Sequence, residues 1–315
     1  AVFYLASAAA FLAVLRRFEV HTLWGVVLAA PIYAYVTEGV LTPVLYSGGP
    51  TPFFPVWFTA WHGLISMALL FVVVRWWAIE QRTGSIAGLS VVLGLFTGTW
   101  LITSLAEHQL QDPDLVAGHG VLVPMEPWDF ARYAVLLTAF LLGAHLLLNA
   151  VWPRRPDRLL VGRSERLLTG FLLVGAAAWT VAAPWALPMF VGLCWLQFRV
   201  LAAHRDGRPA AAPTLLESLG AHASARSLLP LVLVAPSAAL AYWGWWQLEP
   251  SQTMLDVLYY GVIVAQTLVA AVVLVQAWRR TGGRSAPRRS TGVARRHHVV
   301  ASALSTPGSA GRRRP

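Results

Sequence analysis

Two ionisable residues, Glu38 and His62, lie inside strongly apolar stretches of the sequence. A charge or an imidazole inside a bilayer is costly, so it is usually paired or faces water, and it indicates a functional site. Counting from the outer ends of the predicted helices places both residues roughly 10 Å deep, at about 1.5 Å per residue. We expect Glu38 to bind a cation or exchange a proton, with His62 as its hydrogen-bond partner. The alternative is a polar pair that only joins two helices.

The helix that carries Glu38 is expected to bend or break. Pro31, Gly39 and Pro43 flank the carboxylate, and proline interrupts helical hydrogen bonding. A broken segment at membrane depth is tolerated where it lines a cavity or is covered by protein.

Glu107 and His108 end a later apolar stretch, and they are expected to complete this polar outer-leaflet site. They follow a run of small and polar residues at helical spacing that includes Ser90, Gly94 and Thr97. Small residues allow membrane helices to pack closely, so the run predicts a helix contact. The alternative is a polar path that leads inward from the outer loop.

The outer leaflet and the loop above it gather residues that could bind a divalent metal. Imidazole and carboxylate groups are ligands of zinc, copper and iron. The sequence has no HExxH or HxxxH spacing. A metal site is therefore supported only by the types of the residues and not by their spacing. A bis-histidine haem is not expected, because His62 lies in the outer leaflet and His145 in the inner one. The candidate metal ligands are His62, His108, His119, Asp112 and Asp114.

A second polar cluster is predicted nearer the inner face. His145 and Asn149 are four residues apart, so they share one face of a helix. Gln197 lies at a similar depth on another predicted helix. We expect the three side chains to form interhelical hydrogen bonds, each contributing on the order of 1 kcal/mol.

The motifs of several soluble enzyme classes are absent from the sequence. Neither GxxxxGK nor GxGxxG occurs, so no phosphate-binding loop is predicted. No GxSxG motif indicates a hydrolase. Cys194 is the only cysteine, which excludes an intramolecular disulfide and a cysteine-based zinc site. No catalytic residue can be assigned from motifs.

Membrane helices must position these residues. The 315-residue chain is 57% apolar and 12% charged, and its mean hydropathy is +0.59. This composition excludes a soluble enzyme, a disordered chain and a disulfide scaffold. Since about 20 apolar residues cross a bilayer, we predict an all-α, polytopic bundle of about nine transmembrane helices over residues 1–278. The predicted helices are 1–15, 22–45, 56–77, 86–106, 132–152, 166–183, 186–203, 227–247 and 257–278.

The distribution of charge predicts the two sides of this bundle. Arginines gather in alternate loops, including the inner loop 204–226, and Arg75 and Arg82 are assigned to the same side. Carboxylates gather in the outer loop 106–131. Because cytoplasmic loops retain positive charge, we expect a multi-pass plasma-membrane protein with its N-terminus outside and its C-terminus in the cytoplasm. The inner loop also contains TLLESLGAHASAR, a pattern typical of a short amphipathic helix on the membrane surface.

The last 37 residues, 279–315, carry ten arginines and no acidic residue. Their Arg-, Gly-, Ser- and Pro-rich composition predicts a disordered cytoplasmic tail. Such a tail is expected to attract anionic lipid headgroups. No aromatic residues alternate with the arginines, which argues against nucleic acid as a partner. Membrane lipids and other membrane subunits are the expected partners.

Three kinds of function fit these features. The leading interpretation is a membrane subunit or scaffold with a polar Glu/His site that opens to the extracytoplasmic side. A proton-coupled transporter or permease would need a polar route across the membrane that links Glu38 to His145, Asn149 and Gln197. A membrane-embedded enzyme that acts on a lipid or another apolar substrate, with or without a metal, would need a pocket around His62.

Overall fold

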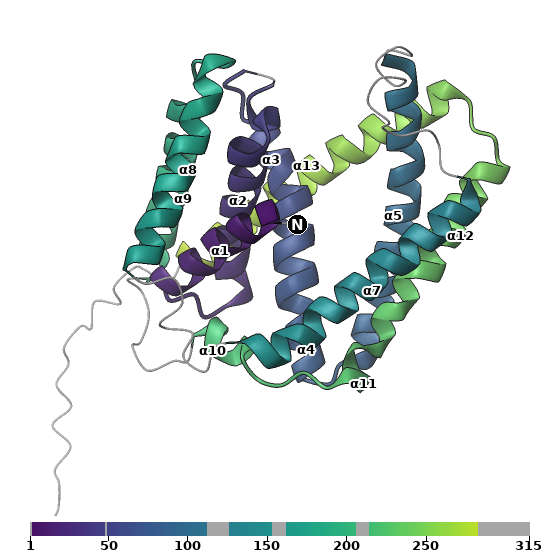
Figure 1. Ribbon diagram of the computed structural model, residues 1–315, viewed down its shortest axis with the longest axis horizontal. Coiled ribbons are helices and arrows are strands. Elements are labelled where there is room, and N and C mark those ends of the chain that lie inside the picture. The colour runs from purple at the N-terminus through teal and green to yellow at the C-terminus, as the bar shows by residue number, and fades with distance from the viewer. Residues whose placement is uncertain (1, 48, 112–125, 153–161, 206–213, 283–315) are drawn as a thin grey trace, which may run out of the picture. The chain divides into compact units, whose positions relative to one another are not determined.

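The computed structural model describes residues 2–47, 49–111, 126–152, 162–205 and 214–282. Every regular element in these ranges is a helix, which confirms the predicted all-α fold (Figure 1). These ranges belong to one unit, Ala1–Ser285, and the second unit, Ala286–Pro315, lies outside the described residues. The α-helices are α1 (Val2–Arg17), α2 (Leu23–Val36), α3 (Phe53–Phe58), α4 (Val74–Ile79), α5 (Thr83–Gln111), α7 (Pro127–Val151), α8 (Arg163–Ala178), α9 (Ala186–Arg205), α10 (Leu215–Leu219), α11 (Ala225–Leu228), α12 (Val234–Gln247) and α13 (Gln252–Gly282).

Seven helical segments in the described ranges are long and apolar enough to cross a membrane, so the chain is a polytopic membrane protein. Two further predicted crossings correspond to α1 and α8, which are helical but only 16 residues long. A count of nine crossings therefore stays a prediction. The seven segments are Leu23–Leu41, Phe53–Ile79, Thr83–Thr103, Pro127–Val151, Ala186–Arg205, Ala225–Gln247 and Thr253–Arg280.

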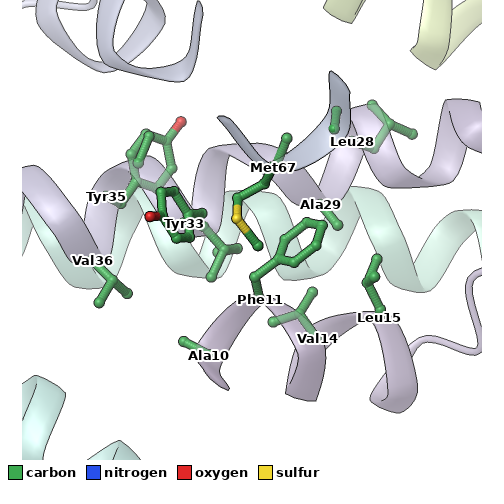
Figure 2. Packing of buried hydrophobic residues seen from close by; sticks show 14 of the residues in the cluster. Ala10, Phe11, Val14, Leu15, Leu28, Ala29, Tyr33, Tyr35, Val36 and Met67 are labelled. Atoms are coloured by element: carbon green, nitrogen blue, oxygen red, sulfur yellow. The ribbon is translucent and has the colours of Figure 1, made fainter. Parts of the chain in front are cut away.

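The central helix of the fold is α2. Its span, Leu23–Leu41, is 83% buried, whereas no other candidate span is more than 39% buried. The Thr22 hydroxyl caps the N-terminus of α2 by accepting a hydrogen bond from the Gly25 amide. The helices α1, α9 and α13 pack against α2, as does the helix that follows α3. Figure 2 shows Phe11 and Met67, from two of these neighbours, packed beside α2.

A second group of helices consists of α5, α7 and α12, in which α12 packs against both α5 and α7. Gly94 and Gly98 of α5 face the backbone of α12. A Cβ atom on Gly94 would lie 2.5 Å from the carbonyl oxygen of Val234, and one on Gly98 would overlap the carbonyl oxygen of Ala238. The predicted close packing of this small-residue run is confirmed at Gly94.

The segment 204–226, which was predicted to be an inner loop, contains the predicted short helix, α10. Thr214 and Glu217 form a reciprocal cap at its N-terminus. Leu215, Leu216 and Leu219 are buried within the protein. The apolar face of α10 therefore packs against α1 and α4, and its location at the membrane surface stays a prediction.

Candidate functional site

Glu38 and His62 are in direct contact. The distance between Glu38 Oε1 and His62 Nε2 is 2.7 Å, and the two side chains are only 10% and 16% exposed. The Thr42 hydroxyl donates a hydrogen bond to the other carboxylate oxygen, Glu38 Oε2, at 2.9 Å. Burial of a carboxylate is costly unless its oxygens are hydrogen-bonded. These two contacts satisfy both oxygens.

Both members of the pair lie where helical geometry departs from the α-helix. The α-helical pattern of α2 ends at Val36 and continues as a π-helical turn, Thr37–Leu41, that contains Glu38. His62 lies in the π-helical segment Thr59–Val73, which connects α3 to α4. The helix therefore changes its geometry at Glu38 and ends at Leu41, before Pro43, instead of breaking at the carboxylate itself. Wide π-helical turns are rare, and they occur frequently at functional sites.

Side chains satisfy the carbonyl groups released where α2 ends. The Tyr46 hydroxyl donates to the Gly39 carbonyl at 2.7 Å, and Trp179 Nε1 donates to the Val40 carbonyl at 3.0 Å. Burial raises the pKa of the Tyr46 phenol, so Tyr46 remains a donor at neutral pH. These bonds fix the backbone on the C-terminal side of Glu38, and with it the position of the carboxylate.

A cavity of about 450 Å³ lies beside His62. Its lining combines many apolar side chains with a few hydroxyl groups from Ser66, Thr97 and Thr138. Among the described residues, Nε2 makes the only hydrogen bond of the His62 imidazole, which leaves Nδ1 for a ligand. The aromatic lining residues besides His62 are Tyr4, Tyr33, Trp61, Phe96, Trp100, Tyr133 and Phe140.

The remaining residues predicted for the outer site are not placed. Glu107 and His108 lie in α5, but their side chains fall outside the described part of the chain, and Asp112, Asp114 and His119 lie outside it altogether. Within the described ranges, no three His, Cys, Asp or Glu side chains form a group that could hold a metal ion. The predicted metal ligands therefore stay a prediction.

The inner cluster differs from the predicted one. His145 Nε2 lies 3.0 Å from the carbonyl oxygen of Leu70, and Asn149 Oδ1 accepts a hydrogen bond from Arg75 at 3.1 Å. Gln197 instead donates to the carbonyl oxygen of Leu28 in α2. His145 and Asn149 are thus joined through Arg75, not through Gln197.

Arg75 is the centre of this inner cluster, and its burial differs from the exposed helix end that the distribution of charge indicated. The residue is fully buried in α4, within the span that continues to Ile79. Its guanidinium connects α4 to α7, to the last residue of α10 and to the segment that follows α10. A charged donor forms stronger hydrogen bonds than a neutral one, so Arg75 holds these elements together. Its acceptors are Leu219 O (2.9 Å from Nε), His145 O (3.1 Å from Nη1), Asn149 Oδ1 and Ala221 O (3.1 and 3.0 Å from Nη2).

The chain matches no family model, and comparisons with curated proteins and with solved structures also find no match. Function is therefore argued from geometry. The geometry offers a buried carboxylate–imidazole pair and an aromatic cavity on one side of it. It also offers a buried guanidinium whose donors are directed at neutral oxygens.

Proposed function

We propose that this membrane protein binds an apolar molecule from the lipid phase in the cavity beside His62. His62 hydrogen-bonds the polar group of the ligand, and Glu38 holds the imidazole in position and exchanges a proton with it. The observation that carries the proposal is the contact between a buried Glu–His pair and a cavity whose other walls are largely apolar.

The size and lining of the cavity support this proposal. Small-molecule sites commonly enclose about 300–1,000 Å³ and combine apolar walls with a few polar groups. The volume of about 450 Å³ lies in that range. Trp61 stands 5.0 Å from Trp100 and 5.8 Å from Phe96, measured between ring centroids. Such a wall favours a flat or unsaturated ligand that carries one oxygen-containing polar group.

The Glu38–His62 contact supports a proton-exchanging role. A 2.7 Å contact between a carboxylate oxygen and a ring nitrogen requires a proton between them. The carboxylate fixes which nitrogen carries that proton, as acidic partners of histidine commonly do. A ligand carbonyl or hydroxyl group at the opposite ring nitrogen would then be linked to Glu38 through the imidazole.

The walls of the cavity favour ligand binding over proton-coupled transport. Among the residues that line the cavity, His62 is the only imidazole and none carries a carboxylate, so the lining offers no chain of proton carriers toward the Arg75 cluster. The competing candidate is a membrane subunit in which the pair only joins helices. It is favoured by the position of Glu38 and His62 on two directly packed helices.

A cavity-filling variant separates these two candidates. Wild-type protein, Ile65→Trp and Leu268→Trp are purified in a mild detergent, and the apolar molecules extracted from each are identified by mass spectrometry. Ile65 lines the cavity, whereas Leu268 of α13 is 62% exposed and lies outside it. We expect one molecular species to accompany wild type and Leu268→Trp and to be lost from Ile65→Trp. A structural pair predicts no species that Ile65→Trp removes.

We further propose the orientation predicted from the arginines, in the plasma membrane with the N-terminus outside. Contacts among residues assigned to the inner side support it: Arg16 and Arg17 pair with Glu165, and Arg205 pairs with Glu19. On this orientation the ten arginines of 279–315 lie near the anionic inner leaflet. Impermeant maleimide applied to intact cells is expected to label Asp112→Cys and not Ser285→Cys, both in a Cys194→Ala background.

A further inference from the structure

A second groove lies apart from the Glu38–His62 site, between α1, α2, α8 and α9. Its volume is about 440 Å³. The body of the groove is apolar, and its lining includes Leu172 and Leu173 of α8 and Phe190 and Val191 of α9. A long hydrocarbon chain would fit such a lining.

The groove has a charged end. Arg17 at the end of α1 and Glu165 at the start of α8 both line it. Arg17 Nη1 lies 3.2 Å from Glu165 Oε1, but this carboxylate is shared with Arg16, whose Nη2 lies 2.9 Å from Oε2. The Arg17 side chain remains 64% exposed. Arg163 and Arg166, which flank Glu165 in the sequence, are exposed as well.

We propose that this groove binds one anionic phospholipid, with an acyl chain along α8 and α9 and the phosphate on Arg17. A guanidinium offers paired N–H donors that match phosphate oxygens, and it is more weakly hydrated than an ammonium group. Basic pockets between transmembrane helices bind anionic lipid headgroups by this means. The groove therefore offers an apolar site for the acyl chain and, at its end, a partly exposed cation for the phosphate.

Another groove, between α7 and α12, shows how an arginine in a similar apolar lining can differ from Arg17. The surface between α7 and α12 also forms an apolar groove with an arginine, Arg132, in its lining. Arg132 pairs with Asp129 at 3.1 Å, so one guanidinium has one carboxylate there, whereas Arg16 and Arg17 share the single carboxylate of Glu165. The cation there is already neutralised, so this groove is expected to take lipid chains without preference for an anionic headgroup.

Native mass spectrometry of the full-length protein tests the proposal. Delipidated protein is exposed to phosphatidylglycerol or to phosphatidylcholine with the same acyl chains, and the bound lipid is counted. We expect wild type to retain one phosphatidylglycerol about fivefold more than phosphatidylcholine, the ratio that about 1 kcal/mol per arginine gives. Arg17→Gln is expected to abolish the preference, and the matched Arg132→Gln is expected to keep it.

Two further experiments test whether the lipid is held by the apolar groove as well as by its headgroup. Ala13→Phe narrows the groove and is expected to lose the retained lipid, whereas Ala139→Phe, in the groove between α7 and α12, keeps it. Inorganic phosphate is expected not to displace the lipid, since the chain contributes to binding. Equal retention of the two lipids by wild type would overturn the proposal. So would loss of the preference in Arg132→Gln, or displacement by phosphate alone.

Discussion

The carbonyl oxygen of Ala30 lies 2.7 Å from the point that a Cβ atom would occupy on Gly63. Gly63 follows His62, so this close approach of two backbones sets the separation at which Glu38 and His62 meet. Gly63→Ala is expected to push the helices apart and to lower the free energy of unfolding by about 1–3 kcal/mol, as overpacking does. Thermal unfolding in detergent measures this loss.

Gly143→Ala is the matched control for Gly63→Ala, because no atom lies within 4 Å of the Cβ position on Gly143. Alanine is a better helix former than glycine by about 1 kcal/mol, so this variant is expected to be as stable as wild type or more so. Equal destabilisation at the two positions would contradict a specific role for the contact with Ala30.

Arg75→Lys is expected to destabilise the protein in spite of the retained charge. A lysine offers its three donors from one nitrogen, whereas Arg75 uses three nitrogens to reach four oxygens. Leaving buried carbonyl groups without donors costs on the order of 3 kcal/mol in total. Arg82→Lys, at a 53% exposed position paired with Glu80, is expected to change stability by less than about 0.5 kcal/mol. Similar unfolding temperatures for the two variants would refute the structural role of Arg75.

Tyr46 is expected to make stability depend on alkaline pH. Burial raises the pKa of its phenol above the ordinary value of about 10, so the folded state favours the protonated form. The stabilisation by this group is fully present below pH 10 and is lost as the pH rises through the folded-state pKa. Tyr46→Phe should be less stable at pH 8 and should lose less stability between pH 9 and pH 11. If the free energy of unfolding changed with pH in the same way in wild type and in Tyr46→Phe, the predicted role of Tyr46 would be ruled out.

Much of the fold follows from local features of the sequence. Runs of apolar residues predict helices wherever they occur, because a bilayer requires every backbone group to be hydrogen-bonded internally. The order of the helices follows from these runs, and the end of the helix shortly after Glu38 follows from Pro43. Depth along a helix is also a local property, and the equal depths counted for Glu38 and His62 predicted that these two residues pair.

The contacts that depend on which helices are neighbours could not be predicted in this way. Gln197 and His145 have similar depths, but Gln197 lies on α9, which packs against α2, so its amide bonds Leu28 instead. Arg75 was assigned to the inner end of the predicted helix 56–77 because arginines usually mark helix ends. Its position inside the apolar run LLFVVVRWWAI was the available signal that the side chain is buried within the protein.

The measurement that bears most directly on the proposed function is the amount of apolar molecule bound per protein in wild type and in His62→Phe. Phenylalanine keeps the bulk of the ring but removes the hydrogen bonds to Glu38 and to the ligand. The proposed function predicts a molecule bound in roughly stoichiometric amount to wild type and roughly tenfold less in the variant, as expected for loss of a buried hydrogen bond to a charged or polar group. Equal amounts in the two folded proteins would contradict it.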